Sequence, residues 1–239
     1  MSAIPRAYID RYNGLLSELS ERMGGRLAQR LTALEWADYD EALVEAVRLV
    51  QGACSASAEE AAYIAAEFYD GLRASQTGRR IGALADAVYN PDATEGAVEA
   101  FARQAGADHA AFAEKCASRL DYEVRRSANG CLASNARRDP KRPRWARVPD
   151  GAETCEWCIM LASRGFVYSS EDAAEHSHAN CQCVVMPGWG DDPEVEGYDP
   201  DYYKDCYDYP EKHPEIRERI NERRRELYAQ RSSGSEAED

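Results

Sequence analysis

Five potential metal ligands lie close together in the second half of this 239-residue chain. They are Cys155 and Cys158, separated by two residues, followed by His178, Cys181 and Cys183. Zinc in proteins prefers four tetrahedral ligands drawn from thiolates and imidazoles. A Cys-x-x-Cys pair lets two thiolates reach one ion from a tight turn, and donors arriving from a separate segment can close the site. The pattern therefore predicts one structural zinc ion.

Five donors for four coordination positions leave one donor over. We expect Cys155, Cys158 and His178 to be ligands, while the fourth ligand is either Cys183 or Cys181. A redox-active Cys-x-x-Cys motif normally follows a strand in a thioredoxin-like βαβ unit, and no such unit is visible in the sequence. A nucleophilic Cys–His pair is the other alternative. The number of donors favours a closed structural site over a catalytic metal, which needs an open coordination position.

The composition limits the kinds of partner that the chain can have. The net charge is −14, the mean hydropathy is −0.64, and 44% of the residues are hydrophobic. A chain this acidic does not bind DNA through its overall field, so any contact with nucleic acid requires a local basic patch. The start of the chain has no secretory signal, and no run approaches the ~20 apolar residues of a membrane span. We therefore expect no membrane partner, and 8 cysteines that stay reduced in a cytoplasm.

The first 130 residues are predicted to be almost wholly helical, because apolar residues recur at three- and four-residue spacing and strict alternation is rare. The first helix is predicted from residue 6 to about residue 34, with Gly24-Gly25 as a point where it kinks or splits. Further helix starts are predicted near Asp40, at Ser57 with Glu60 in capping-box spacing, at Asp92 and near Asp108.

The fold class predicted for the whole chain is mainly α, in three parts. A helical body covers residues 1–134, and a small α+β zinc-binding module covers residues 135–189. Residues 190–239 form an acidic, Tyr-rich segment that we expect to be irregular to Pro210, then one charged terminal helix and a disordered tail. Within the module we expect a short helix from Cys155 to Ser163 and strand-like pieces at Phe166–Tyr168 and Val184–Met186.

A local run of positive charge crosses the junction between the first two parts. Its functional interpretation is contact with packaged DNA or with an acidic protein surface, and its alternative is a solvated linker whose arginines pair with the protein's own acids. The residues are Arg125, Arg126, Arg137, Arg138, Lys141, Arg142, Arg144 and Arg147.

The residues around the candidate ligands resemble a known family. The run from Arg144 to Tyr168, followed by His178-x-x-Cys181-x-Cys183, is similar to the signature of phage minor head proteins. These include Mu-F-like head-morphogenesis proteins and the actinobacteriophage proteins encoded beside the portal, often labelled capsid maturation proteins. The resemblance is specific from about Arg137 to Pro187. It implies a minor capsid protein that joins the prohead near the portal in the host cytoplasm and is retained inside the virion.

The partners implied by this resemblance are the portal and the capsid or scaffold proteins, and no small-molecule substrate is expected. Two alternatives stay open. One is a capsid maturation protease of the Cys or Ser hydrolase type, for which Ser163, Ser169 and Ser170 are merely the nearby serines. The other is a zinc module that binds nucleic acid. Since no nucleophile, base and orienting group can be placed together, we expect no enzymatic activity and assign no catalytic residue.

Overall fold

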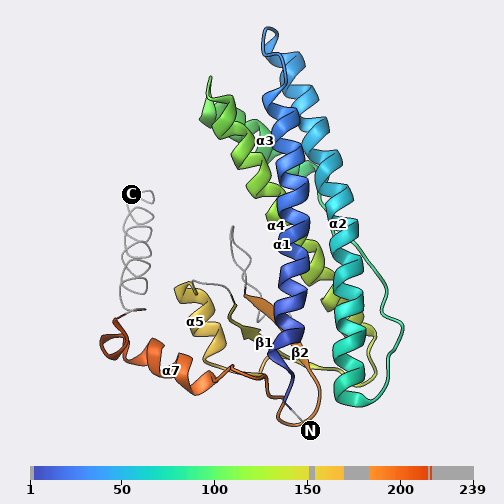
Figure 1. Cartoon of the computed structure of the whole chain (residues 1–239), viewed down its shortest axis with the longest axis vertical. Helices are drawn as coiled ribbons and strands as arrows, with labels where there is room; N and C mark the ends of the chain where they lie inside the picture. Colours follow the sequence, from blue (N-terminus) through green and yellow to red (C-terminus); the bar gives the residue numbers. More distant parts are fainter. Residues whose placement is uncertain (1–2, 151–153, 170–182, 215, 217–239) are drawn as a thin grey trace, which may run out of the picture.

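The computed structural model describes residues 3–150, 154–169, 183–214 and 216. Four helices form an elongated body, and a two-stranded sheet with two shorter helices lies at its lower end in the view of Figure 1. The prediction of a mainly α fold is confirmed. The helices are α1 (Arg6–Thr32), α2 (Tyr39–Thr77), α3 (Pro91–Ala105), α4 (His109–Arg138), α5 (Glu156–Ala162) and α7 (Pro200–Asp208), and the strands are β1 (Arg144–Val148) and β2 (Val184–Gly188).

The first helix is continuous through its glycine pair. We predicted a kink or a break at Gly24-Gly25, and this prediction is wrong, because α1 runs unbroken from Arg6 to Thr32. Gly24 is buried, and a Cβ atom built there would lie 3.5 Å from the Cβ of Ala117 on α4. The glycine therefore allows α1 and α4 to approach each other closely, and the surrounding packing offsets its low helix propensity.

The second helix is also longer than predicted. Its N-cap is Asp38, whose side chain accepts a hydrogen bond from the Glu41 amide at 3.1 Å, and its C-cap is Gly78 in the left-handed conformation. The predicted helix start at Ser57 is wrong, because Ser57 lies fully buried in the middle of α2. The Ser-x-x-Glu spacing is local, whereas the alanine-rich sequence on both sides favours an uninterrupted helix.

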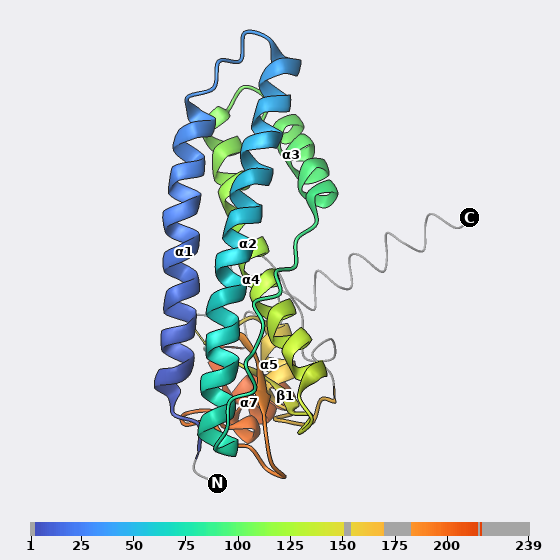
Figure 2. The same ribbon diagram turned by 90° about the vertical axis from the view of Figure 1, so that its right-hand side faces the viewer.

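The helices α3 and α4 begin where the sequence indicated. Asn90 caps α3 by accepting a hydrogen bond from the Ala93 amide at 3.0 Å. This cap lies two residues before the predicted start at Asp92. Asp108 caps α4 by accepting from the Ala111 amide at 2.9 Å, which confirms the predicted start. As Figure 2 shows, α1, α2 and α4 run along the length of the body, while the shorter α3 lies against its upper half.

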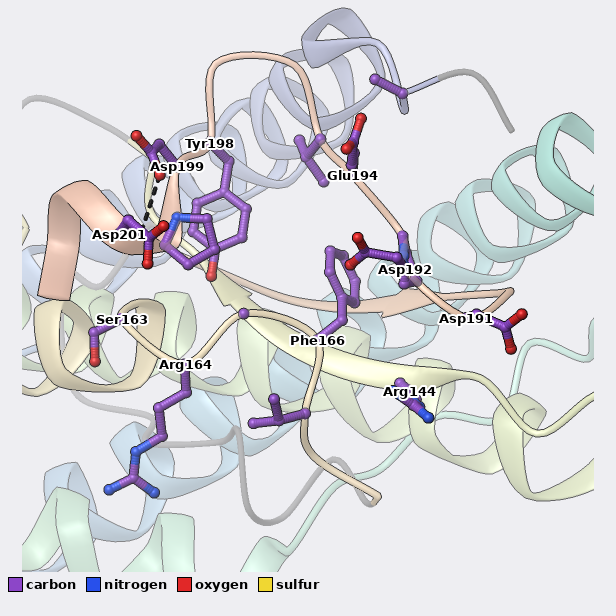
Figure 3. A pocket seen from close by; sticks show the side chains of 16 residues that line it. Arg144, Ser163, Arg164, Phe166, Asp191, Asp192, Glu194, Tyr198, Asp199 and Asp201 are labelled. Carbon is purple, nitrogen blue, oxygen red and sulfur yellow. Dashed lines mark hydrogen bonds between the residues drawn. The ribbon is translucent and has the colours of Figure 1, made fainter.

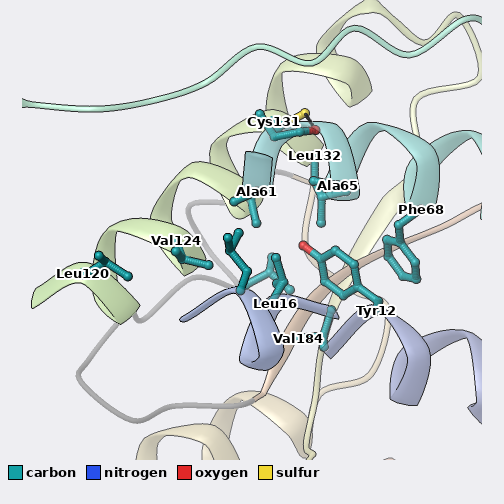
Figure 4. Packing of buried hydrophobic residues seen from close by; sticks show 14 of the residues in the cluster. Tyr12, Leu16, Ala61, Ala65, Phe68, Leu120, Val124, Cys131, Leu132 and Val184 are labelled. Atoms are coloured by element: carbon teal, nitrogen blue, oxygen red, sulfur yellow. Dashed lines mark hydrogen bonds between the residues drawn. The ribbon is translucent and has the colours of Figure 1, made fainter. Parts of the chain in front are cut away.

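Small side chains bring the three long helices together. Ala61 and Ala65 of α2 are fully buried, and Figure 4 shows them between Leu16 of α1 and Leu132 of α4. Small residues at such positions let helix backbones approach, and the larger neighbours fill the remaining space. Tyr12 of α1 continues this core downward toward the sheet, beside Val184 of β2 (Figure 4).

The two strands pair antiparallel, from Arg144 opposite Gly188 to Val148 opposite Val184. The prediction of extended structure at Val184–Met186 is therefore confirmed. The predicted piece at Phe166–Tyr168 makes a single bridge, between Tyr168 and Trp145. Every residue of β2 is buried. The strand contacts α2 and α4 of the body, and Gly188 at its end faces Phe166 and Pro193.

The core of the body continues into the residues around the sheet. Trp145, Met186 and Trp189 belong to the same cluster of buried side chains as the helical core. The helix α4 passes the predicted boundary between residues 134 and 135 and ends at Arg138. The division into three parts stays a prediction, since packing alone does not say which parts fold independently.

The acidic segment after β2 contains a helix that we did not predict. Asp199 caps α7 by accepting from the Asp201 amide at 2.9 Å, and Pro200 occupies its first position. Cys206 of α7 is fully buried and packs against Ile159 of α5. The expectation of an irregular segment to Pro210 is thus wrong for this stretch. Of the predicted terminal helix, the structure describes only Ile216, which is helical, and the rest lies outside the described residues.

None of the helices in the described part of the chain is long and apolar enough to cross a membrane.

Candidate functional site

Three of the five predicted metal ligands lie together at the start of α5. Cys155 is the N-cap of this helix, and its Sγ accepts a hydrogen bond from the Cys158 amide at 3.5 Å. Cys158, one turn later, is fully buried. Cys183, directly before β2, packs against both of them and is 8% exposed. We call Cys155, Cys158 and Cys183 the cysteine cluster.

The cysteine cluster fits a soft metal ion by its chemistry but does not by itself complete a site. Three neighbouring sulfur donors, two of them buried, suit zinc, which takes four ligands in structural sites. Within the ranges that the structure describes, no three Cys, His, Asp or Glu side chains are arranged as a metal site. The zinc-binding module of the predicted fold class is therefore not supported by the described geometry. His178 and Cys181 lie outside the described residues, and so does the donor that would close the site.

The three cysteines of the helical body are core residues. Cys54, Cys116 and Cys131 are fully buried on α2 and α4. Burial raises the pKa of the Cys54 and Cys116 thiols to about 12 in each case, and it also raises the pKa of Cys131. These thiols are uncharged at neutral pH and behave as small apolar side chains.

A buried hydrogen-bonded group joins the body to the sheet. The carboxylate of Asp139, at the end of α4, accepts from Arg73 Nε at 2.6 Å and Nη2 at 3.1 Å. It also accepts from the hydroxyl of Tyr69 at 3.1 Å and from the indole N–H of Trp189 at 3.0 Å. We call Tyr69, Arg73, Asp139 and Trp189 the Asp139 hub.

The electrostatics of this hub favour the charged form of the acid. Burial raises the pKa of Asp139, but the hydrogen bonds from Arg73, the Lys141 amide and Tyr69 outweigh it and hold the pKa below its ordinary value. Sequence reasoning missed the hub. The feature of the sequence that could have revealed it is Arg73, a charged residue four positions after Tyr69 and thus on the buried face of α2.

The structure places the residues of the basic run in different surroundings. Arg125 pairs with Asp121 at 3.3 Å, Arg126 with Glu123 at 3.3 Å, and Arg138 with Asp86. Arg147 is buried on β1. The other four side chains are exposed, namely Arg137, Lys141, Arg142 and Arg144.

An open pocket of about 600 Å³ lies below the sheet, between the loop after α5 and the loop after β2. Figure 3 shows Arg144 and Arg164 on its wall with the carboxylates of Asp191, Asp192 and Glu194. Asp199 and Asp201, at the start of α7, complete its charged rim. Because many of the side chains that line the pocket are charged, it does not resemble the apolar cleft of a small-molecule site.

The serine in this pocket is not arranged as a nucleophile. The hydroxyl of Ser163 donates to the carbonyl oxygen of Met160 at 2.7 Å, as a side chain at a helix end commonly does. Among the residues that the structure describes, no histidine lines the pocket. Ser169 is exposed, and Ser170 lies outside the described residues.

A second groove, of about 580 Å³, runs between α1 and α2 on the body. Its lining is mainly aromatic and aliphatic, and the side chains of Tyr8, Leu15 and Tyr63 on its rim are 38%, 41% and 69% exposed. The ring of Tyr12 stacks on Phe68 at its floor, with the centroids 4.2 Å apart. Exposed aromatic groups of this kind are typical of surfaces that bind another protein.

The comparisons with known proteins point to phages. The family model described as VG15 protein matches residues 3–209. The Gene 15 proteins of Mycobacterium phage L5 and Mycobacterium phage D29 are each 34% identical to the chain over the matched stretch. That stretch covers 18% of this chain in both cases, and 28% and 27% of the two relatives, so the chain spans less than a third of their length. No solved structure matches the chain.

Proposed function

The chain belongs to the VG15 protein family, and we propose that it is a minor head protein of a tailed phage or prophage. It is a phage protein of this family, related to mycobacteriophage proteins. The observation that carries the proposal is the motif from Arg144 to Cys183, which resembles that of phage head-morphogenesis proteins. In this role the protein joins the prohead near the portal and is retained inside the capsid.

The groove between α1 and α2 supports a role in assembly. An assembly protein needs a surface for its partner, and Tyr8, Leu15 and Tyr63 give this groove the exposed aromatic and aliphatic groups that anchor protein interfaces. We propose that a portal or scaffold protein occupies it. The groove is formed by two long helices that pack on a common core, so its backbone is already ordered before binding. Little conformational entropy is therefore lost when a partner binds.

We further propose a structural zinc ion at the cysteine cluster. Cys155, Cys158 and Cys183 would supply three ligands, and either His178 or Cys181 would supply the fourth. Support comes from the packing of the three thiols against one another and from the small size of the surrounding segment, since modules of ~40–50 residues commonly rely on a metal or a disulfide. The ion would fix the start of α5 to the start of β2.

The head-protein proposal is tested by quantitative mass spectrometry of purified phage particles. We expect peptides of this chain at a small fraction of the major capsid protein, and we expect them to survive protease treatment of intact particles. If the chain is absent from mature particles, and its deletion leaves the major capsid protein uncleaved, a maturation protease is the correct function.

The docking surface is tested by changing its rim. The double variant Leu15→Asp/Tyr63→Asp should lower incorporation into particles by about tenfold or more, because it places two charges where an apolar contact forms. Val44→Asp is the matched control, since Val44 is 70% exposed on α2 and does not line the groove. Equal incorporation of both variants would show that the partner binds elsewhere.

The zinc proposal is tested by elemental analysis of the purified full chain. We expect one zinc per chain, lost in Cys155→Ser and retained in Cys116→Ala, whose buried thiol lies in the helical body. A metal-free wild-type protein with a fully cooperative unfolding transition would refute the site without affecting the proposed role in the phage head.

A further inference from the structure

Two segments far apart in the sequence meet at the lower end of the helical body. The helix α2 ends at Thr77 and α4 ends at Arg138, and both ends lie low in Figures 1 and 2. Arg73 bridges the segments that follow. Its Nη1 donates to the carbonyl oxygen of Arg79 at 2.5 Å, and its Nε donates to Asp139 at 2.6 Å. The residues after α2 are therefore held beside the residues after α4.

This junction brings four exposed cations together. We define the terminal basic surface as Arg79, Arg137, Lys141 and Arg142, all of which are exposed. Arg79, Lys141 and Arg142 have no carboxylate within 4 Å among the residues that the structure describes. Arg80 is left out of this surface because it lines the groove between α1 and α2, where it pairs with Glu67 at 3.4 Å. The surface is thus positive in a chain whose net charge is −14.

The turn that carries two of these cations is rigid. The Asp139 carboxylate accepts from the Lys141 amide at 2.9 Å, and the Asp139 carbonyl oxygen accepts from the Arg142 amide at 3.1 Å. Prolines stand on both sides of the pair, at 140 and 143. Arg142 has φ of 40°, a conformation that non-glycine residues rarely adopt and that persists only where the surroundings impose it. Asp139 thereby holds the backbone that carries both cations.

We infer that the terminal basic surface binds the phosphate backbone of nucleic acid. Lys and Arg side chains neutralise phosphates without regard to base sequence, which suits a surface composed of charges alone. None of the exposed large hydrophobic side chains of the described residues falls within 78–80 or 137–143. A protein-binding surface would normally place aromatic or aliphatic groups at its centre, as the groove between α1 and α2 does. The lack of exposed large apolar groups in these described segments therefore favours nucleic acid over an acidic protein as the ligand of this surface.

The acidity of the whole chain does not prevent such binding. Charges separated by more than about 10 Å are largely screened at 0.1 M salt, so the nearest phosphates respond mainly to the local cations. Arg144 is excluded from the surface because it lines the pocket that also holds Asp191 and Asp192. This inference is independent of the proposed zinc ion and of the role in the phage head.

The test is fluorescence anisotropy of a labelled 30-base-pair duplex titrated with the full chain between 50 and 200 mM NaCl. Neutralising about four phosphates should lower the affinity on the order of 100-fold across this range. The variant Lys141→Glu/Arg142→Glu should weaken binding at 50 mM NaCl by about tenfold or more, and should reduce the slope of log affinity against log salt by about 2.

The matched control is Arg26→Glu/Arg30→Glu. It makes the same change in net charge at two exposed positions near the C-terminal end of α1, outside the terminal basic surface. We expect it to bind the duplex as the wild-type chain does. Equal weakening by both double variants would mean that only the overall charge matters, and the inference would be wrong. It would also be wrong if the wild-type chain does not bind at 50 mM NaCl. Tighter binding of poly-L-glutamate than of the duplex would assign the surface to an acidic protein instead.

Discussion

Three buried cysteines of the helical body and the three cysteines of the cysteine cluster lie in different surroundings. Cys54, Cys116 and Cys131 are spread along α2 and α4 among apolar side chains. The cysteine cluster instead gathers thiols from two segments at one point. The comparison teaches that burial alone makes a cysteine inert, whereas burial beside other thiols creates a set of metal donors.

Thiol labelling gives the largest expected difference between the two regions. At pH 8 a thiol with a pKa of about 12 is ionised in roughly one molecule in ten thousand. After treatment with a zinc chelator, peptides containing Cys155 and Cys158 should react with iodoacetamide at least about 10³-fold faster than those containing Cys54 or Cys116. Peptide mass spectrometry over time measures both rates. If chelation leaves the labelling rate of Cys155 unchanged, the cysteine cluster does not bind zinc.

Breaking the Asp139 hub tests whether the two regions depend on each other. Asp139→Ala leaves the buried Arg73 guanidinium without its acid, and removal of one partner of a buried ion pair costs about 3–5 kcal/mol. Urea denaturation should show this loss in the free energy of unfolding. The matched control is Asp86→Ala, which breaks the exposed pair with Arg138 and should cost no more than about 1 kcal/mol. Similar losses in both variants would mean that the hub does not hold the regions together.

Two glycines sharpen the comparison through packing. At Gly188 in β2 a Cβ atom would lie 2.6 Å from Phe166 Cε1 and 2.7 Å from Pro193 Cβ, so Gly188→Ala should destabilise the protein by about 1–3 kcal/mol. At Gly25 in α1 nothing lies within 4 Å of that position, and Gly25→Ala should stabilise the protein by about 0.5–1 kcal/mol. The midpoint of thermal unfolding should therefore fall in Gly188→Ala and rise in Gly25→Ala, relative to the wild type. A neutral Gly188→Ala would indicate a loosely packed region around the sheet.

The pH dependence of stability gives the smallest effect. The pKa of Asp139 in the folded protein is below its ordinary value of 3.8, so its stabilising contribution is present above that value and is lost as the pH falls through the folded pKa. The difference in unfolding free energy between the wild type and Asp139→Asn should be constant from pH 7 to about pH 5 and shrink below about pH 4. Asp86→Asn serves as the reference. A difference that grows on acidification would contradict the role assigned to the carboxylate.

Much of the helical body could be predicted from the sequence. The two wrong predictions, a kink or break in α1 and a helix start within α2, have a common cause. The helix starts near Asn90 and Asp108 depend on a capping side chain and the residues just after it, so they are readable locally. The continuity of α1 through Gly24-Gly25 and of α2 through Ser57 is not readable in this way. Both depend on contacts with α4, which outweigh the local preference for a break or a cap.

The candidate site was predictable in its donors but not in their grouping. The Cys-x-x-Cys spacing predicts that Cys155 and Cys158 share one turn, and they do. The spacing left Cys181 and Cys183 as alternatives for the last ligand. The structure brings Cys183 to the cluster because β2 pairs with β1 and starts at the neighbouring residue. That placement follows from strand pairing and not from the spacing of the motif.

By itself, the sequence determined the helical character of the body, the approximate starts of α3 and α4, the strand at Val184 and the resemblance to phage head proteins. Each of these depends on residues within a few positions of one another. Only the tertiary structure decided that Asp139 binds Arg73, 66 residues earlier, and that the exposed cations after α2 and α4 form one surface. The physical reason is that such contacts require two helices to pack side by side and end together, and a pattern of local periodicity does not specify which faces meet.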